Sequence, residues 1–427
     1  MAAFTAEVFQ NEYLPENGDL VDAVITVTAS GGGAVSARQG EQLEIIVIDT
    51  SGSMAGDRGR KIVAARQATK AAIGSIRDGV LFAVIGGREH ARIVYPDQIG
   101  LARASDDTRA AAQRAVEGIQ PKGGTAIGSW LLAAAQLVDA APGALAHTIL
   151  LTDGKNESET DEQLDEAIRY CTGRFQCDAR GLGTDWEVDE LRRVASALLG
   201  TVDIVPDPDE LEAEFTALTE AAMGKESSVS LRLWTPKSSE IQFVRQVAPA
   251  LDDLTGKAEG VNALTADYPL GAWSGDEARD YHVRIRIPVG GVGDERLAAR
   301  VMLVVDGEER PAALVRALWT SDEALSTRIN PEVAHYTGQA ELAEAIHTGL
   351  MARDAGDEKA ATVKLGRAVQ LATEAGNNDT VKLLQEVVDV EDAKSGTVRL
   401  KREVAEADTM ALDVRSTRTV RVRKDGA

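Results

Sequence analysis

Cysteine and histidine are scarce in this sequence of 427 residues. Cys171 and Cys177 are the only cysteines, and no histidine lies close to them in the sequence. Two cysteines without nearby histidines do not form a zinc site. We expect both thiols to be free in a reducing compartment, with a disulfide between them as the alternative. The histidines form no ligand motif and are scattered at His90, His147, His282, His335 and His347.

The sequence also lacks long hydrophobic runs. A membrane-spanning helix needs roughly twenty apolar residues, and no run approaches that length. Residues 1–19 are polar and include Glu7, Glu12, Glu16 and Asp19. They lack the basic start and the apolar core of a signal peptide. These absences predict a cytoplasmic protein.

Positive charge is in deficit, because the formal net charge is −22 at pH 7. Such a surface repels the phosphates of nucleic acids and acidic membranes, so we expect neither as a partner. Solubility is the simplest role for the acidity. The contents of 44% hydrophobic and 27% charged residues are those of a soluble globular protein that can bury real cores. The chain length suggests about two to four domains.

The segment 45–54, Ile-Ile-Val-Ile-Asp-Thr-Ser-Gly-Ser-Met, is the most informative part of the chain. Its apolar start predicts a strand buried on both faces, as in a parallel sheet. Asp49, Ser51 and Ser53 follow on alternate residues, so one carboxylate and two hydroxyls can converge on one point. Such hard oxygen donors suit Mg²⁺ or another hard cation. Ligands of open α/β sheets also bind outside the carboxyl ends of the strands.

Two later segments add oxygen donors. Thr125 lies in Lys-Gly-Gly-Thr-Ala-Ile-Gly (122–128), a flexible loop just before an apolar helical run. Asp153 lies near the end of His-Thr-Ile-Leu-Leu-Thr-Asp-Gly (147–154), which predicts a second buried strand. Ordinary capping and turn residues would explain any one of these segments. The occurrence of all three in order, at strand ends, favours a metal site.

Together the segments resemble the metal-ion-dependent adhesion site of the von Willebrand factor type A (VWA) domain. The pattern of that family is Asp-x-Ser-x-Ser, then a Thr, then an Asp. The sequence matches every position, and the matching residues are Asp49, Ser51, Ser53, Thr125 and Asp153. The chain thus resembles a bacterial, cytosolic, multi-domain VWA protein with a complete adhesion site.

The resemblance implies that Ser51, Ser53 and Thr125 hold Mg²⁺ at the top of the sheet, with Mn²⁺ or Ca²⁺ as alternative ions. Asp49 and Asp153 would bind the ion directly or through water. An acidic side chain of a partner protein would then displace a water and become a ligand. The implied function is that of a metal-dependent protein-binding or adaptor protein, not of an enzyme. We expect the rim of the site to contain Met54, Asp57, Arg58, Lys122, Trp130, Lys155 and Asn156. They would face a partner and set its choice, or would be ordinary surface residues.

Two other functions compete with this interpretation. A Mg²⁺-dependent phosphatase of the haloacid-dehalogenase type also begins with a strand and an Asp, but it needs a second Asp two residues later as acid and base. Ser51 stands at that position. A Gly-x-Ser-x-Gly elbow and a phosphate-binding Gly-x-x-x-x-Gly-Lys-Ser/Thr loop are also absent from the sequence. The remaining alternative is a metal-independent scaffold that binds through a helical region.

Residues 42–223 alternate between strand and helix patterns. This alternation predicts a doubly wound, Rossmann-like α/β domain of the VWA type, with helices on both faces of the sheet. We expect strands at 43–48, 80–85, 148–151, 175–182 and 202–205, with 91–95 as an antiparallel partner of 80–85. We expect helices at 58–76, 106–118 with Ser105 as its cap, 126–140, 159–170, 188–199 and 208–222.

The segments outside this block predict an antiparallel β-sandwich. In residues 282–287, Val283, Ile285 and Ile287 lie on one face of a strand and two arginines on the other. Residues 20–29 alternate in the same way. We expect them to join the later strands, so that the VWA domain is inserted in the sandwich; the alternative is an edge strand of the VWA sheet. Further strands are expected at 229–233, 241–247, 299–305 and 314–319.

The chain becomes helical from about residue 331, with helices expected at 340–352, 357–374 and 379–388. Residues 360–375 resemble part of a tetratricopeptide (TPR) repeat, but a stable array needs about three units, which favours a small helical bundle. Beyond residue 396 we expect strands at 397–400 and 419–422. The basic end of the tail either docks on an acidic surface or forms a solvated edge strand.

These patterns divide the chain into five parts. They are an amino-terminal strand segment of the sandwich (1–40), the VWA domain (41–224), the β-sandwich (225–321), the helical, TPR-like region (322–394) and a carboxyl-terminal tail with a basic end (395–427).

Overall fold

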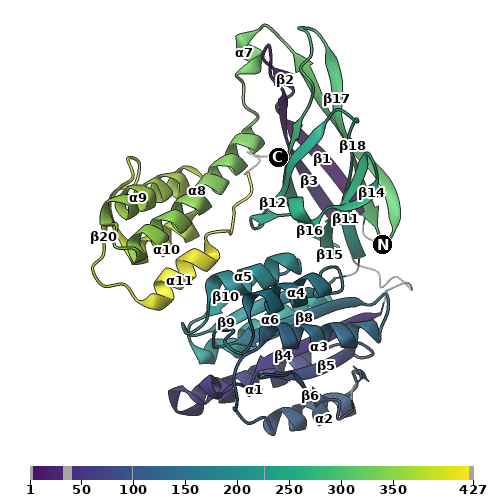
Figure 1. Cartoon of the computed structure of the whole chain (residues 1–427), viewed down its shortest axis with the longest axis vertical. Helices are drawn as coiled ribbons and strands as arrows, with labels where there is room; N and C mark the ends of the chain where they lie inside the picture. Colours follow the sequence, from purple (N-terminus) through teal and green to yellow (C-terminus); the bar gives the residue numbers. More distant parts are fainter. Residues whose placement is uncertain (1–2, 32–40, 99, 226, 423–427) are drawn as a thin grey trace. The chain divides into compact units, whose positions relative to one another are not determined.

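The computed structural model describes residues 3–31, 41–98, 100–225 and 227–422 (Figure 1). The chain forms two compact units. The first contains Ala34–Ser227 and Gly271–Trp273, and it is built on a mostly parallel sheet. The second contains Met1–Gly33, Ser228–Leu270 and Ser274–Ala427, and it is built on two mainly antiparallel sheets and a group of helices.

The sheet of the first unit has the order β10-β9-β8-β4-β5-β6, and β7 also pairs with β5. Neighbouring strands from β10 to β5 are parallel, whereas β6 and β7 run antiparallel to β5. The predicted strands and the antiparallel partner of the second strand are therefore confirmed. The strands are β4 (Gln42–Asp49), β5 (Leu81–Gly87), β6 (Arg92–Tyr95), β7 (Ala102–Arg103), β8 (Leu145–Thr152), β9 (Gln176–Leu182) and β10 (Val202–Val205).

Six helices alternate with these strands, which confirms the predicted doubly wound fold. They are α1 (Arg60–Ser75), α2 (Asp106–Glu117), α3 (Ile127–Asp139), α4 (Asp161–Cys171), α5 (Val188–Ala197) and α6 (Leu211–Met223), with short 3-10 turns η1 (Gly52–Ala55), η2 (Asp57–Gly59) and η3 (Pro208–Glu210). The expected cap of α2 is present: the Ser105 hydroxyl accepts from the Thr108 backbone N–H, and the Thr108 hydroxyl accepts from the Ser105 N–H.

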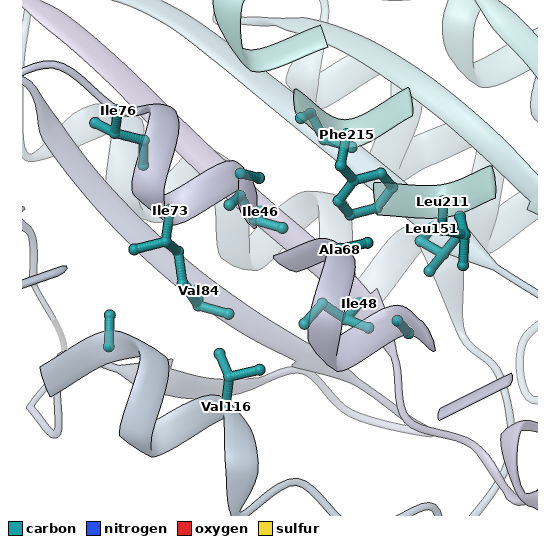
Figure 2. Close-up of a cluster of buried hydrophobic side chains, with 14 of the residues drawn as sticks. Ile46, Ile48, Ala68, Ile73, Ile76, Val84, Val116, Leu151, Leu211 and Phe215 are labelled. Atoms are coloured by element: carbon teal, nitrogen blue, oxygen red, sulfur yellow. The ribbon is translucent and has the colours of Figure 1, made fainter. Parts of the chain in front are cut away.

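One face of the sheet packs against α1, α2 and α6. Figure 2 shows Ile48 and Leu151 from the sheet packed with Ala68 of α1 and Phe215 of α6. These four side chains are fully buried. Each large apolar side chain buried in this way contributes about 1.5–3 kcal/mol relative to an exposed position. This core holds the strands whose ends form the candidate site.

Two further sheets form most of the second unit. Their strand orders are β1-β3-β16-β12-β13 and β14-β15-β11-β17-β18-β2. Contacts of β18 with β1 and β3 join the two sheets. The strands are β1 (Ala3–Gln10), β2 (Tyr13–Leu14), β3 (Leu20–Ser30), β11 (Ser227–Trp234), β12 (Glu240–Ala248), β13 (Asp252–Asp253), β14 (Glu259–Asn262), β15 (Thr265–Trp273), β16 (Glu277–Arg286), β17 (Glu295–Val305) and β18 (Glu308–Trp319), with a 3-10 turn η4 (Thr255–Lys257).

The amino-terminal strand β3 lies inside the five-stranded sheet. It pairs antiparallel with β16 over its whole length, from Leu20 beside Arg286 to Ala29 beside Glu277. The chain therefore leaves this sheet after β3, forms the parallel sheet, and returns. The apolar alternation explains the placement, because Val21, Ala23, Ile25 and Val27 are fully buried on one face.

Four helices of the second unit pack around a core of their own. They are α8 (Pro331–Asp354), α9 (Glu358–Glu374), α10 (Asn378–Val387) and α11 (Glu406–Arg415), with the hairpin strands β19 (Val388–Asp392) and β20 (Thr397–Leu400). The short α7 (Glu323–Ser326) contacts β2 instead. Ile346, Val369, Val398 and Leu412 share this core, so the hairpin and α11 belong to the helical group. The boundary expected at residue 394 falls inside the hairpin, and α11 was not expected from the sequence.

The tail after α11 differs from the expectation, because residues 419–422 do not form a strand. The Gln339 side chain instead forms hydrogen bonds with the backbone of Val420. Its Nε2 donates to the Val420 carbonyl at 2.5 Å, and its Oε1 accepts from the Val420 N–H at 3.2 Å. Arg421 donates to both carboxylate oxygens of buried Asp280, at 2.7 and 2.9 Å. Arg421 of the basic tail thus pairs with an acid of its own chain, whereas residues 423–427 lie outside the described residues.

Both cysteines are free, as expected, and both are buried. Burial raises the pKa of the Cys171 thiol to about 12 and raises that of Cys177 as well, so both are poor nucleophiles. Among the described residues, none of the helices combines the length and apolar character needed to cross a membrane.

A row of charged residues crosses three neighbouring strands near their amino ends. The His147 ring of β8 bonds to Glu44 of β4 through Nδ1 at 3.0 Å, and to Asp178 of β9 through Nε2 at 2.8 Å. Burial alone would lower the pKa of His147, but the two carboxylates outweigh it and raise the pKa to about 10. Both ring nitrogens are therefore protonated at neutral pH and tie the three strands together.

We predict that His147→Gln destabilises the first unit by about 3 kcal/mol at pH 7, because it leaves Glu44 buried without its cation. The folded-state pKa of about 10 exceeds the ordinary value of 6.5, so the stabilisation is complete below pH 6.5 and is lost as the pH rises through about 10. Urea unfolding at pH 6, 8 and 10 should show that the difference in free energy of unfolding between wild type and variant becomes smaller as the pH rises. His90→Gln, at an exposed site, is the control and should change little. A gap that is constant with pH would contradict the prediction.

Candidate metal centre

The five predicted site residues lie on three loops at one edge of the parallel sheet. Asp49 is the last residue of β4, and Asp153 directly follows β8. Because β4 and β8 are parallel neighbours with Ile48 beside Leu151, their carboxyl ends lie side by side. Thr125 precedes α3, whose first residue is Ile127.

A chain of hydrogen bonds links the two carboxylates. The Ser51 backbone N–H donates to Asp49 Oδ1 at 2.7 Å. The Ser51 and Ser53 hydroxyl oxygens are 2.8 Å apart, and the Ser53 hydroxyl donates to Asp153 Oδ1 at 2.6 Å. The structure thus brings four of the predicted residues into one connected group.

Thr125 joins this group at Gly154. A Cβ atom on Gly154 would lie 3.5 Å from Ser53 Oγ and 3.7 Å from Thr125 Oγ1. The two hydroxyls therefore face the same small space, which the missing side chain of Gly154 leaves free. Ser51 and Asp153 are hydrogen-bonded to Ser53 beside this space, and Asp49 is connected to it through Ser51.

Backbone hydrogen bonds hold the three loops in place. The Gly52 N–H donates to the Gly123 carbonyl at 2.8 Å, and the Lys122 N–H donates to the Thr50 carbonyl at 2.8 Å. The Ser158 N–H donates to the Thr125 carbonyl at 2.9 Å. Because the backbone is fixed, the hydroxyls are positioned without any ligand.

The loops are further supported by residues that the sequence suggested for the rim. Met54, Trp130 and Asn156 are buried, so the expectation that they face a partner is wrong. Met54 belongs to the hydrophobic core that the sheet forms with α1, α2 and α6. The Trp130 Nε1–H donates to the Arg88 carbonyl at 2.6 Å, and Asn156 Oδ1 accepts from the Ile127 N–H at 2.8 Å, at the start of α3.

The other four rim residues are exposed. Asp57 and Arg58 adopt positive φ angles of 48° and 54°, which non-glycine residues rarely do. Lys155 forms an ion pair with Glu187, and Lys122 carries the backbone bond to Thr50. Of the five site residues, Ser53 is exposed and the other four are buried. The group therefore opens to solvent at Ser53.

Sequence reasoning missed two polar residues that touch the carboxylates. The Thr152 hydroxyl donates to Asp49 Oδ2 at 2.7 Å. The Lys61 ammonium group donates to Asp153 Oδ2 at 2.8 Å and lies 3.4 Å from Asp185 Oδ2. Thr152 could have been found, since it precedes Asp153 on a strand paired with β4. Lys61 carries no such signal, because it reaches the site from the first turn of α1.

The electrostatics of the group favour a cation. Burial raises the pKa of Asp49 to about 6, although hydrogen bonds from Ser51 and Thr152 oppose the rise. Burial would lower the pKa of Lys61, but its pairing with Asp153 and Asp185 outweighs this and raises it. Two buried acidic side chains, Asp49 and Asp153, thus lie near one partly buried ammonium group. The excess negative charge disfavours the ionised carboxylates and would be relieved by a cation.

The donor set fits a hard divalent cation. It consists of two carboxylates and three hydroxyls, all oxygen ligands of the type that Mg²⁺ and Ca²⁺ take. Among the described residues, no group of three or more His, Cys, Asp or Glu side chains could hold a metal ion. The hydroxyls are therefore an essential part of the candidate site.

Comparisons with known proteins agree with the fold. One family model, the von Willebrand factor type A domain, matches residues 44–204, and another, the von Willebrand factor type A C-terminal domain, matches residues 370–416. A solved structure, von Willebrand factor type A from Catenulispora acidiphila, is 49% identical and has a TM-score of 0.93; the match covers 99% of this chain and 98% of that chain. The chain therefore belongs to the von Willebrand factor type A family, whose domains generally mediate protein–protein interaction.

Two more distant structures share the fold alone. The ArnB paralog VWA2 from Sulfolobus acidocaldarius is 13% identical with a TM-score of 0.61, and the match covers 99% of this chain and 100% of that chain. The human COPII-coat protein Sec24c is 10% identical with a TM-score of 0.54, over 89% of this chain and 57% of that chain. None of the curated proteins matches the chain.

We predict that Gly87→Ala loosens the Thr125 loop by displacing Trp130. A Cβ on Gly87, at the end of β5, would lie 2.3 Å from the Trp130 indole. Such overpacking costs about 1–3 kcal/mol, which urea unfolding should detect as a lower midpoint. Gly74→Ala in α1 is the control: its Cβ would meet only Gln113 Nε2 at 3.8 Å, and alanine favours a helix. Equal midpoints for the two variants would contradict the prediction.

Proposed function

We propose that this protein is a divalent-metal-dependent protein-binding or adaptor protein. Ser51, Ser53 and Thr125 would hold Mg²⁺, with Asp49 and Asp153 binding directly or through water. The observation that supports the proposal is the hydrogen-bonded group of Asp49, Ser51, Ser53 and Asp153, together with the Ser53 and Thr125 hydroxyls that face the space at Gly154. When bound, the ion supplies a positively charged point that a partner's Glu or Asp carboxylate can ligate.

The protein's own residues support binding rather than catalysis. The two proposed carboxylate ligands balance the charge of a divalent ion, but Lys61 already pairs with one of them, Asp153. The site with its ion would therefore keep a net positive charge. A carboxylate from outside is then attracted to the site. Ser51 occupies the place where a haloacid-dehalogenase-type phosphatase needs its acid and base, and its hydroxyl is bonded to Ser53. We therefore propose a non-enzymatic role.

We also propose a cytoplasmic location, a bacterial source and a protein partner. The free, buried thiols of Cys171 and Cys177 support a reducing, cytoplasmic location. The similarity to the Catenulispora acidiphila protein supports a bacterial source. The net charge of −22 supports a protein partner rather than nucleic acid or an acidic membrane.

The decisive experiment combines metal binding with partner capture. Asp49→Ala with Ser51→Ala removes one carboxylate and one hydroxyl. We expect calorimetry to show Mg²⁺ binding by wild type and at least about a tenfold weaker affinity in the double variant, because two of five ligands are lost. Asp107→Ala, at an exposed site in α2, should bind like wild type.

Capture on immobilised protein should follow the same pattern. We expect partner proteins to be retained with Mg²⁺ and lost with EDTA or with the double variant. Retention that is unchanged in EDTA and in the double variant would reject the proposal and favour a metal-independent scaffold acting through the helical region.

A second prediction concerns the space at Gly154. Gly154→Ala places a methyl group 3.5 Å from Ser53 Oγ and 3.7 Å from Thr125 Oγ1, where an ion would have to lie. We expect Mg²⁺ affinity to fall by about tenfold or more while the free energy of unfolding stays within about 0.5 kcal/mol of wild type, because no atom lies closer than an ordinary contact. Electron paramagnetic resonance of free Mn²⁺ provides an independent measurement. Mn²⁺ affinity equal to wild type would show that this space is not the ion site.

A further inference from the structure

Lys61 is the one ammonium group among the described residues that is bonded to a proposed ligand of the ion. It lies in the first turn of α1, and its side chain is only 14% exposed. Its partner Asp153 has no exposed side-chain surface. A lysine held this firmly beside a metal ligand must affect how that ligand meets a cation.

Both oxygens of Asp153 are engaged within the protein. Ser53 donates to Oδ1 at 2.6 Å, and Lys61 donates to Oδ2 at 2.8 Å. An ion that uses Asp153 must therefore share or displace one of these donors. The ion must also approach the positive charge of Lys61, and two like charges repel strongly where solvent screening is weak.

The structure offers Lys61 a second place to go. Asp185 Oδ2 lies 3.4 Å from the ammonium nitrogen, and the Asp185 side chain is 77% exposed. Asp185 lies between β9 and α5, outside the proposed ligand set. The Lys61 ammonium group can thus move toward Asp185 and still have an ion-pair partner. That movement frees Asp153 Oδ2 for the ion.

We propose that Lys61 is a tethered cation that competes with the divalent ion for Asp153 and so sets the metal affinity of the site. Asp185 relieves the competition by accepting the displaced ammonium group. The inference rests on the proposed metal site and deepens it, because it names the residue that adjusts its affinity. It applies to Mg²⁺, Mn²⁺ and Ca²⁺ alike, since the competition is between charges.

The test measures metal affinity in the full chain by calorimetry with Mg²⁺ and by Mn²⁺ paramagnetic resonance. Lys61→Met removes the charge and keeps the length of the side chain, so we expect about tenfold or more tighter binding. Asp185→Asn removes the second partner and holds Lys61 on Asp153, so we expect weaker binding, by about twofold to threefold because Asp185 is exposed. The two variants therefore shift the affinity in opposite directions.

Lys70→Met is the matched control. Lys70 lies on the same helix and pairs with Glu117, so the same substitution should leave metal affinity unchanged. Circular dichroism verifies that each variant is folded. If Lys61→Met does not fold, the direction of the Asp185→Asn shift decides.

The outcomes separate this inference from the proposed function. Wild-type binding with an unchanged or weaker affinity in Lys61→Met would overturn the competition and show that Lys61 merely positions Asp153. Binding by Lys61→Met alone, with none by wild type, would support the competition in its strongest form. Absence of Mg²⁺ and Mn²⁺ binding in wild type and every variant would overturn the metal site and this inference together.

Discussion

Parallel pairing between β4 and β8 is the constraint on which the candidate site depends. The register places Ile48 beside Leu151, so Asp49 ends its strand next to Thr152 and close to Asp153. A slip of one residue would turn alternate side chains to the opposite face and separate the two carboxylates. Both strands are apolar and buried, and helices pack on both faces, so such a slip would disturb the core as well. The same burial that stabilises the fold therefore fixes the site.

The buried carboxylates at the two ends of this sheet differ in the cations that pair with them. At the amino ends, the doubly protonated His147 bonds to both Glu44 and Asp178, and Arg180 supplies a second positive charge near Asp178. At the carboxyl ends, Lys61 pairs with Asp153 and with Asp185, and no cation among the described residues is bonded to Asp49. A closed charge cluster stabilises and offers nothing to a ligand, whereas an incompletely compensated one attracts a counter-ion. This contrast explains why the metal proposal concerns one end of the sheet only.

Much of the architecture could be predicted because its signals are local. Continuous apolar runs mark the parallel strands, and the alternation of Val21, Ala23, Ile25 and Val27 marks β3 as a half-buried strand. The resemblance of three loops to one family pattern identified the candidate ligands. Elements without such signals were missed, among them β15, which contains Pro269 and Gly271, and α11. The sequence of residues 419–422 resembles a strand, but the backbone N–H and carbonyl of Val420 bond to the Gln339 side chain of α8 instead of to another strand.

The sequence by itself determined the type of fold and the identity of the five candidate ligands, because strand periodicity and loop motifs are properties of neighbouring residues. Only the tertiary structure decided that Met54, Trp130 and Asn156 support the loops from within rather than face a partner. It alone revealed Lys61, since a side chain on α1 meets Asp153 only after the helix has packed beside the end of β8. Contacts between distant segments depend on packing, and packing is set by the whole chain.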